Sequence, residues 1–224
     1  MMAPDLKALA KYRMLVFDCD GVVLDSNQVK IQAYYDTAMA YGATPVQAQA
    51  LVDHHIALGG ISRYPKFEYF LRTILQQTST ETEMQRLLGL FAAELEHSLL
   101  ACAVAPGLEQ LRTLLPDTRW MMISGGDQEE VRGVMHKRGL ADYFDAGIYG
   151  SPDNKDTILA REIASGALQT PAIFFGDSRY DHQSSTRAGL DFVFLSDWTD
   201  VPGWQDYCSQ HHICIMQRLD QLLR

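Results

Sequence analysis

The sequence predicts an α/β protein, with a Rossmann-like parallel sheet as its core and an α-helical cap subdomain inserted after the first strand. Two observations lead to this fold class. Short apolar runs rich in Val, Ile and Phe alternate with helical stretches of roughly 10–15 residues, which is the pattern of a parallel sheet covered by helices. The alternation is interrupted once, over residues 26–101, where only helical patterns occur.

The apolar runs are the expected strands, because each is short, ends in turn or acidic residues and has the composition of a strand buried on both faces. They lie at residues 14–17, 120–123, 146–149, 172–175, 192–195 and 213–216. The helices of the core are expected between the later runs, at about 106–115, 127–139, 153–165 and 179–189.

The inserted segment has helix signals of its own. Thr80 followed by Glu83 is the pattern of a capping box that opens a helix. The apolar stripe of that helix recurs every three or four residues, at Met84, Leu88, Phe91, Leu95 and Leu99. The segment ends at the turn-forming residues 105–107. We therefore assign residues 1–25 and 102–224 to the α/β core and residues 26–101 to a helical cap.

Composition excludes several classes of protein. The 224 residues are 47% apolar and 21% charged, which is the balance of a globular chain and not of a disordered one. Lys and Arg total 19 against 28 Asp and Glu, so the formal charge is −9. An acidic chain lacks the basic face that nucleic acid and membrane surfaces require, so neither is an expected partner.

The expected location is the cytoplasm. No apolar run reaches the 18 or more residues of a membrane helix, and Lys7, Lys11 and Arg13 interrupt the apolar stretches where a signal peptide would have its core. The four cysteines have no metal-binding spacing and are too few for a disulfide framework, so we expect reduced thiols.

Two carboxylates follow the first strand. Asp18 and Asp20 leave the strand on the same side, roughly 6–7 Å apart along the chain. Ligands of open α/β sheets bind at the carboxyl ends of strands, and displacement at phosphorus uses one carboxylate as nucleophile and a second as acid–base group. The alternative is a solvated acidic strand end that caps the next helix.

Further acidic residues follow the expected strand at 172–175. If both strand ends face one crevice, Asp177 and Asp181 join Asp18 and Asp20 there, and four carboxylates would repel one another. A hard divalent cation relieves this repulsion, and an all-oxygen set suits Mg²⁺ better than Zn²⁺. Taken alone, Asp177 could equally be an ordinary helix N-cap.

Two more positions can hold phosphate. Ser124 and Gly125 follow the strand at 120–123 and are expected to open a helix, where backbone N–H groups and a hydroxyl bind phosphate oxygens. Lys155 lies near the start of another helix, where its charge would offset the carboxylates and the transferring group. An N-cap serine and a surface lysine are the ordinary alternatives.

This arrangement resembles the haloacid dehalogenase-like (HAD) hydrolase superfamily over essentially the whole chain. The residues that match its four ordered motifs are Asp18-Cys19-Asp20-Gly21-Val22, Ser124, Lys155 and Gly176-Asp177 with Asp181. The helical insertion also falls where that superfamily has its cap. The last motif is similar to that of the phosphoglycolate phosphatase-like branch.

The resemblance implies a Mg²⁺-dependent phosphatase that hydrolyses a small phosphorylated metabolite. It implies that Asp18 attacks phosphorus to form an aspartyl-phosphate and that Asp20 is the acid–base residue. Mg²⁺ would be held by Asp18, the Asp20 main chain and Asp177, with Asp181 either joining them or orienting Lys155. Ser124 and Lys155 would bind the phosphoryl oxygens, with Gly125 beside them.

Two alternatives remain open. Residues 60–63 resemble the Gly-x-Ser-Arg of β-phosphoglucomutase-like members, in which the arginine binds a second phosphate. Those mutases have a histidine ten residues after the second aspartate, whereas this chain has Lys30 there. The other alternative is a non-catalytic phosphate-binding or regulatory relative, which would be expected to lack at least one of Asp18, Asp20, Lys155 or Asp177.

Substrate specificity is expected to come from the cap. Arg63 and Lys66 follow Gly59-Gly60, a flexible pair suited to a loop that reaches the core. In a chain of charge −9, basic residues near the pocket would attract an anionic substrate. We expect closure of residues 26–101 to bring Arg63 to the distal end of the substrate.

Overall fold

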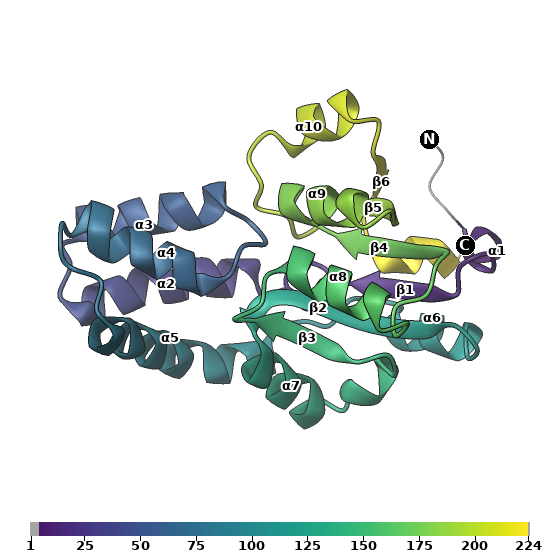
Figure 1. The fold of residues 1–224 in the computed structure, drawn as a ribbon, viewed down its shortest axis with the longest axis horizontal. Coiled ribbons are helices and arrows are strands. Elements are labelled where there is room, and N and C mark those ends of the chain that lie inside the picture. The colour runs from purple at the N-terminus through teal and green to yellow at the C-terminus, as the bar shows by residue number, and fades with distance from the viewer. Residues whose placement is uncertain (1–4, 224) are drawn as a thin grey trace.

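The computed structural model describes residues 5–223 (Figure 1). Its centre is a parallel sheet of six strands in the order β3-β2-β1-β4-β5-β6. The strands are β1 (Met14–Phe17), β2 (Arg119–Asp127), β3 (Ile148–Ser151), β4 (Ala172–Gly176), β5 (Asp191–Leu195) and β6 (Cys214–Met216). The predicted fold class, an α/β protein with a Rossmann-like parallel sheet, is confirmed.

Alternate residues of the central strand pack on opposite faces of the sheet. Leu15 and Phe17 of β1 belong to one apolar cluster, and Met14 and Val16 belong to another. All four are buried, which explains why this strand is a continuous apolar run and does not alternate with polar residues.

Helices cover both faces, as Figure 1 shows. On one face lie α6 (Leu108–Leu114), α7 (Gln128–Lys137) and the 3₁₀ helix η3 (Leu219–Leu223), which contribute to the same apolar cluster as Phe17. On the other lie α8 (Lys155–Ala164) and α9 (Arg179–Arg187), with α8 packed around Val16. Short elements complete the core: α1 (Leu6–Leu9), η2 (Ala141–Tyr143) and α10 (Trp204–Gln210).

Residues 27–101 form a helical layer beside the carboxyl ends of the strands (Figure 1). Its helices are α2 (Asn27–Tyr41), α3 (Pro45–Ala57), α4 (Arg63–Tyr69), the π-helical turn η1 (Phe70–Ile74) and α5 (Glu81–Ala101). Tyr34, Phe67 and Phe91 pack their rings together in its centre. The layer therefore has an aromatic core, which joins the apolar cluster on the α7 face of the sheet.

The start of α5 differs in part from the expected capping box. The Thr80 hydroxyl accepts a hydrogen bond from the backbone N–H of Glu83, as predicted. The Glu83 side chain does not complete the box, because it accepts a hydrogen bond from the Tyr41 hydroxyl of α2. A contact between two helices thus takes the place of a local one, which is why the four-residue pattern could not show it.

Two adjacent segments connect the helical layer to the sheet. Asp25 donates its backbone N–H to the Ala103 carbonyl at 2.9 Å, and Ala105 donates to the Val23 carbonyl at 2.9 Å. Leu24 and Val104 form an isolated antiparallel bridge between the same two segments. The division into a core and a cap at 25/26 and 101/102 stays a prediction, and these crossings are where it would place the hinge.

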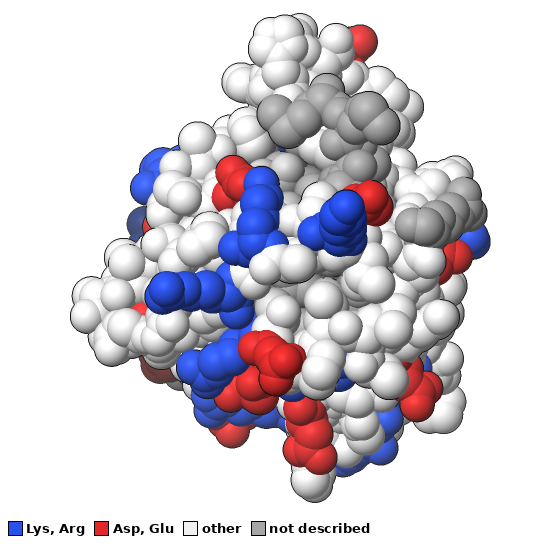
Figure 2. All heavy atoms as spheres, turned by 90° about the vertical axis from the view of Figure 1, so that its right-hand side faces the viewer, with Lys and Arg blue, Asp and Glu red and all other residues white. Residues whose placement is uncertain are grey.

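The surface opposite the helical layer carries both signs of charge. In Figure 2, basic and acidic side chains of the described residues are interspersed there over a mainly uncharged surface. Within residues 5–223, none of the helices has the length and apolar character that crossing a bilayer would need. The cytoplasmic location and the exclusion of nucleic-acid partners stay predictions.

Candidate active site

The carboxyl ends of β1 and β4 bring three acidic residues together. The two strands are neighbours, with Phe17 in register with Phe175, so Asp18 follows one strand beside Asp177, which follows the other. Asp181 lies in the first turn of α9. Carboxylate oxygens of Asp18, Asp177 and Asp181 all lie within 4.8 Å of one another, and all three residues are buried. The predicted meeting of the two strand ends is therefore observed.

Lys155 joins this acidic group from the start of α8. Its Nζ lies 2.9 Å from Asp18 Oδ1 and 2.5 Å from Asp181 Oδ1, and its side chain is 1% exposed. Burial alone would lower the pKa of Lys155, but Asp18 and Asp181 raise it, so the ammonium form is the stable one. Lys155 is thus a buried cation placed against the predicted nucleophile, and not a surface lysine.

Asp181 is fixed from both sides. Its Oδ1 faces Lys155, and its Oδ2 accepts hydrogen bonds from the Ser178 hydroxyl at 2.6 Å and the Ser178 backbone N–H at 3.1 Å. Ser178 in turn caps α9 through a reciprocal capping box with Asp181. Of the two roles left open for Asp181, the orientation of Lys155 has a direct contact behind it, while a metal-ligand role stays a prediction.

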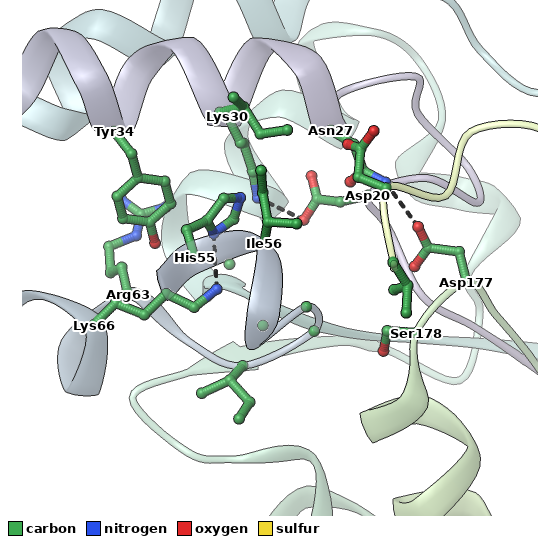
Figure 3. Close-up of a pocket in the computed structure, with 18 of the residues that line it drawn as sticks. Asp20, Asn27, Lys30, Tyr34, His55, Ile56, Arg63, Lys66, Asp177 and Ser178 are labelled. Atoms are coloured by element: carbon green, nitrogen blue, oxygen red, sulfur yellow. Dashed lines mark hydrogen bonds and ion pairs between the residues drawn. The ribbon is translucent and has the colours of Figure 1, made fainter. Parts of the chain in front are cut away.

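Asp20 lies outside this acidic trio and faces the helical layer. Its Oδ1 accepts a hydrogen bond from the Ser26 hydroxyl at 2.6 Å, and its Oδ2 lies 2.5 Å from Lys30 Nζ (Figure 3). Burial tends to raise the pKa of Asp20, but the charge and hydrogen bond of Lys30 outweigh burial and lower it. The side chain of Asp20 is therefore held as a carboxylate by the first turn of α2.

The acidic trio carries more negative charge than its protein partners balance. Burial, together with the charges of Asp181 and Asp20, raises the pKa of Asp18 to about 7 although Lys155 acts in the opposite direction. Burial and the neighbouring Asp18 and Asp181 likewise raise the pKa of Asp177 well above its usual value. A buried set of oxygen ligands with excess negative charge fits a hard divalent cation such as Mg²⁺.

The segment after β2 differs from what was expected. Residues 124–126 do not open a helix, because β2 continues to Asp127 with a shift in its pairing to β3. Asp127 caps α7 by accepting hydrogen bonds from the N–H groups of Glu129 and Glu130. Ser124 is fully buried, and its hydroxyl accepts a hydrogen bond from the Gly126 N–H at 2.9 Å. Ser124 therefore lies inside β2 and not at a helix start as predicted, and its part in phosphate binding stays a prediction.

A pocket between the sheet and the helical layer is lined by Asp18, Asp20 and Asp177. Figure 3 shows Asp20 and Asp177 at this pocket. The loop before α4 closes against the core at this point. A Cβ on Gly125 would lie 2.5 Å from the Gly60 carbonyl oxygen, so only glycine permits this approach. Gly60 has φ +80° and packs against Ser178. The loop at 59–61 therefore reaches the core.

The basic residues of α4 take different partners. Arg63 is buried and forms two hydrogen bonds with Glu130 of α7, at 2.6 and 3.0 Å. Lys66 is also buried, and its Nζ lies 2.9 Å from His55 Nδ1 (Figure 3). Both line the pocket, but the charge of Arg63 already has a protein partner. Its predicted contact with a substrate stays a prediction.

Sequence reasoning missed three side chains that shape the site. Lys30 was weighed only as a departure from a mutase histidine, whereas it forms the ion pair with Asp20. Asn27 donates a hydrogen bond to Asp177 Oδ2 at 2.7 Å, and Glu130 holds Arg63. The spacing of ten residues between Asp20 and Lys30 was a usable signal, because it places the first turn of α2 beside the end of β1. The other two contacts had no local signature.

Comparison with known proteins gives the same fold. A structure described as a HAD hydrolase, family IA, variant 3, from Entamoeba histolytica has a TM-score of 0.71 at 16% identity, with 94% of this chain and 97% of that one covered. A hydrolase from Pseudomonas syringae has a TM-score of 0.70 at 18% identity, covering 94% and 96%. A predicted phosphoglycolate phosphatase from Haemophilus somnus has a TM-score of 0.69 at 16% identity, covering 95% and 97%. A search of curated proteins found no match.

The family model described as haloacid dehalogenase-like hydrolase matches residues 12–189. That span runs from the residues before β1 to the end of α9, so it includes the acidic trio, Lys155 and the whole helical layer. The chain belongs to the haloacid dehalogenase-like hydrolases.

Proposed function

We propose that this hydrolase is a Mg²⁺-dependent phosphatase that cleaves a small-molecule phosphomonoester through an aspartyl-phosphate on Asp18. The observation that carries the proposal is the placement of Asp18. One of its carboxylate oxygens is held by Lys155 and by the Cys19 N–H at 2.7 Å, within a buried trio of carboxylates. A buried carboxylate fixed in this way is suited to nucleophilic attack at one defined point.

Asp18, Asp177 and Asp181 are the side chains that would hold Mg²⁺, with the Asp20 main chain as a further ligand. Bound there, the cation supplies positive charge that offsets the carboxylates and polarises the phosphoryl oxygens. Lys155 adds a fixed positive charge beside Asp18. Ser124, Gly125 and Lys155 are the residues that would bind the phosphoryl oxygens.

The chemistry follows in two displacements. An Asp18 oxygen forms a bond to phosphorus, the bond from phosphorus to the ester oxygen breaks, and the leaving oxygen takes a proton from the Asp20 carboxyl group, which becomes a carboxylate beside Lys30. A water molecule then gives a proton to Asp20 and attacks the phosphorus of the aspartyl-phosphate, which releases phosphate and restores Asp18. The carboxylate form of Asp20 that Lys30 favours is the form that the second step needs.

Trapping the intermediate tests this proposal. Brief reaction with a ³²P-labelled aryl phosphate and Mg²⁺, followed by acid quenching, should leave label on the protein that hydroxylamine releases, as expected for an acyl phosphate. Asp18→Asn should abolish both the label and turnover, lowering turnover by several orders of magnitude. Asp53→Asn, on the exposed surface of α3, is the matched control and should behave as the natural chain. Turnover by Asp18→Asn would contradict the covalent route.

The mutase alternative has less support. Its second phosphate would need the arginine of the Gly60–Arg63 segment, but Arg63 is bonded to Glu130, and Lys30 stands where those enzymes have a histidine. The non-catalytic alternative also has less support, because Asp18, Asp20, Lys155 and Asp177 are all present and gathered at one edge of the sheet.

A further inference from the structure

Lys66 differs from the other cations around the pocket. Among the described residues, Lys30 pairs with Asp20, Arg63 with Glu130, and Lys155 with Asp18 and Asp181. Within that same part of the chain, Lys66 has no carboxylate partner, and the side chain within hydrogen-bond distance of its Nζ is His55.

The surroundings of Lys66 disfavour an isolated charge. The residue is 1% exposed, and its Nζ lies 5.6 Å from the centre of the Tyr34 ring. Burial, followed by the charge of Lys30, lowers the pKa of Lys66 to about 7. Burial and Lys66 itself also hold the pKa of His55 well below its usual value, so the histidine supplies no negative charge and accepts a hydrogen bond as a neutral ring. A buried ammonium with only a neutral partner is costly unless an anion joins it.

Lys66 also occupies the right place to meet a ligand of the active site. It lines the same pocket as Asp18 and Asp20, and Figure 3 shows its side chain on the other side of that pocket from Asp177. Two of the charges that act on it, those of Asp20 and Lys155, belong to the candidate active site. The pocket is small, with a volume of about 70 Å³, which suits a short substrate.

We propose that the substrate carries a second anionic group, a carboxylate or a second phosphate, and that Lys66 binds this group, with His55 holding the Lys66 side chain in place. The proposal rests on the proposed phosphatase function and names its substrate class: short phosphomonoesters with an anionic distal end. It also assigns the recognition of that end to Lys66, because the charge of Arg63 is already taken up by Glu130.

Paired substrates test this directly. Phosphoglycolate is compared with its amide, and ethylene glycol bisphosphate with ethyl phosphate, each pair by the ratio of the two kcat/KM values. The anionic member of at least one pair should be preferred by about 10- to 100-fold, the range for a hydrogen bond to a charged group. The pair that shows the preference distinguishes a carboxylate from a phosphate.

Substitutions of Lys66 test whether this residue causes the preference for the anionic substrate. Lys66→Met should reduce the ratio within the preferred pair to a few-fold, and Lys66→Arg, which keeps the charge, should retain part of it. The matched control is Arg72→Met, an exposed cation of the same helical layer, which should leave the ratio unchanged. Thermal unfolding of each variant establishes that it is folded. An unchanged ratio in folded Lys66→Met, or no preference for either anionic ester in the natural chain, would overturn the proposal.

Binding without turnover separates this inference from the phosphatase function. In the presence of Mg²⁺, phosphonoacetate should bind the natural chain at least about tenfold more tightly than phosphonoacetamide, and Lys66→Met should remove the difference. If no phosphomonoester is hydrolysed but this difference is found, the phosphatase proposal fails and the anion site stands. If esters are hydrolysed but the two phosphonates bind equally, the anion site fails alone.

Discussion

Arg63 of α4 and Glu130 of α7 form a bidentate ion pair across the junction of the helical layer and the sheet domain, with contacts of 2.6 and 3.0 Å. The residues are 67 positions apart in the chain, and Arg63 also lies over the Phe91 ring at 4.6 Å. Because its side chain is 4% exposed and that of Glu130 is 16% exposed, this contact is little screened by solvent. It joins the two parts at the wall of the pocket.

Removing one partner of this pair should therefore destabilise the protein. Arg63→Met leaves the Glu130 carboxylate partly buried without its partner, and we expect a loss of about 3 kcal/mol in the free energy of unfolding. Urea unfolding of Arg63→Met, Glu130→Gln and the double variant checks this. The double variant should lose clearly less than the sum of the single losses. Additive losses would mean that the two side chains do not interact in solution.

Mg²⁺ should stabilise the folded chain even without substrate. A ligand that binds only the native state raises the melting temperature, so titration with MgCl₂ should raise Tm and EDTA should reverse the rise and abolish turnover. Asp177→Asn should need much more Mg²⁺ for the same shift in Tm. Asp206→Asn, on the exposed side of α10, serves as control. Equal responses of the two variants would remove Asp177 from the metal site.

The lowered pKa of Lys66 leads to a prediction about stability and pH. The folded pKa is about 7 and the ordinary value is 10.5, so between these pH values the unfolded chain binds more protons and stability rises with pH. Below about pH 7, Lys66 is protonated in both states, so the full cost of burying its ammonium group reduces the free energy of unfolding. Lys66→Met should therefore stabilise the protein by an amount of the order of a few kcal/mol at pH 6.5 and by much less at pH 9.5.

Urea unfolding of the natural chain and of Lys66→Met at both pH values measures this difference. Lys11→Met is the control, because the Lys11 side chain is 64% exposed and should give no pH-dependent gain of this kind. A gain from Lys66→Met that is the same at both pH values would show that Lys66 titrates normally in the folded protein.

Closure of the loop at 59–61 should depend on Gly125. In Gly125→Ala the new methyl group would lie 2.5 Å from the Gly60 carbonyl oxygen, so the loop must move away from the core. We expect kcat/KM to fall by about 10- to 100-fold, the effect of misplacing groups by about 1 Å. Gly133→Ala, in α7 with open space around it, is the matched control. Equal kinetics in the two variants would show that this close approach is not needed for turnover.

Substitution of Asp20 should slow hydrolysis of the aspartyl-phosphate more than its formation. Without a carboxylate to accept the water proton, Asp20→Asn should slow turnover by about 10²–10⁴-fold. Rapid-quench experiments should then show labelled aspartyl-phosphate accumulating on Asp18, in contrast to its complete absence in Asp18→Asn. Asp20→Asn with normal turnover would remove Asp20 from the reaction.

The sequence was a sufficient guide to the core because buried parallel strands have a distinct composition. The apolar runs ending at Phe17 and Phe175 placed Asp18 and Asp177 at neighbouring strand ends, and the structure brings both together. The prediction from local sequence was wrong where a segment could either start a helix or continue a strand. Residues 124–126 have the small side chains of a helix start, yet they continue β2 because of its pairing with β3.

The contact of α4 with the sheet domain could not be predicted. The ion pair of Arg63 with Glu130 depends on how α4 lies against the sheet, which no local pattern records, whereas the ten-residue spacing of Asp20 and Lys30 was a usable signal for their ion pair. The predicted apolar stripe of α5 is confirmed at Phe91, Leu95 and Leu99, which are buried. Leu87, not Leu88, is the fully buried residue of its first half, because α5 packs against both α2 and α4 and buries a wider face than a single stripe.

The crossing segments between the sheet and the helical layer link the movement of the layer to the chemistry. Both side-chain partners of Asp20, Ser26 and Lys30, lie at the start of α2, directly after the segment that is bonded to residues 103–105. A rotation of α2 relative to the sheet would change the geometry of both contacts. If Asp20 is the acid–base residue as we propose, its proton transfer would therefore depend on the position of α2 relative to the sheet. Substitutions in the crossings can alter the timing of the reaction without touching any group that reacts.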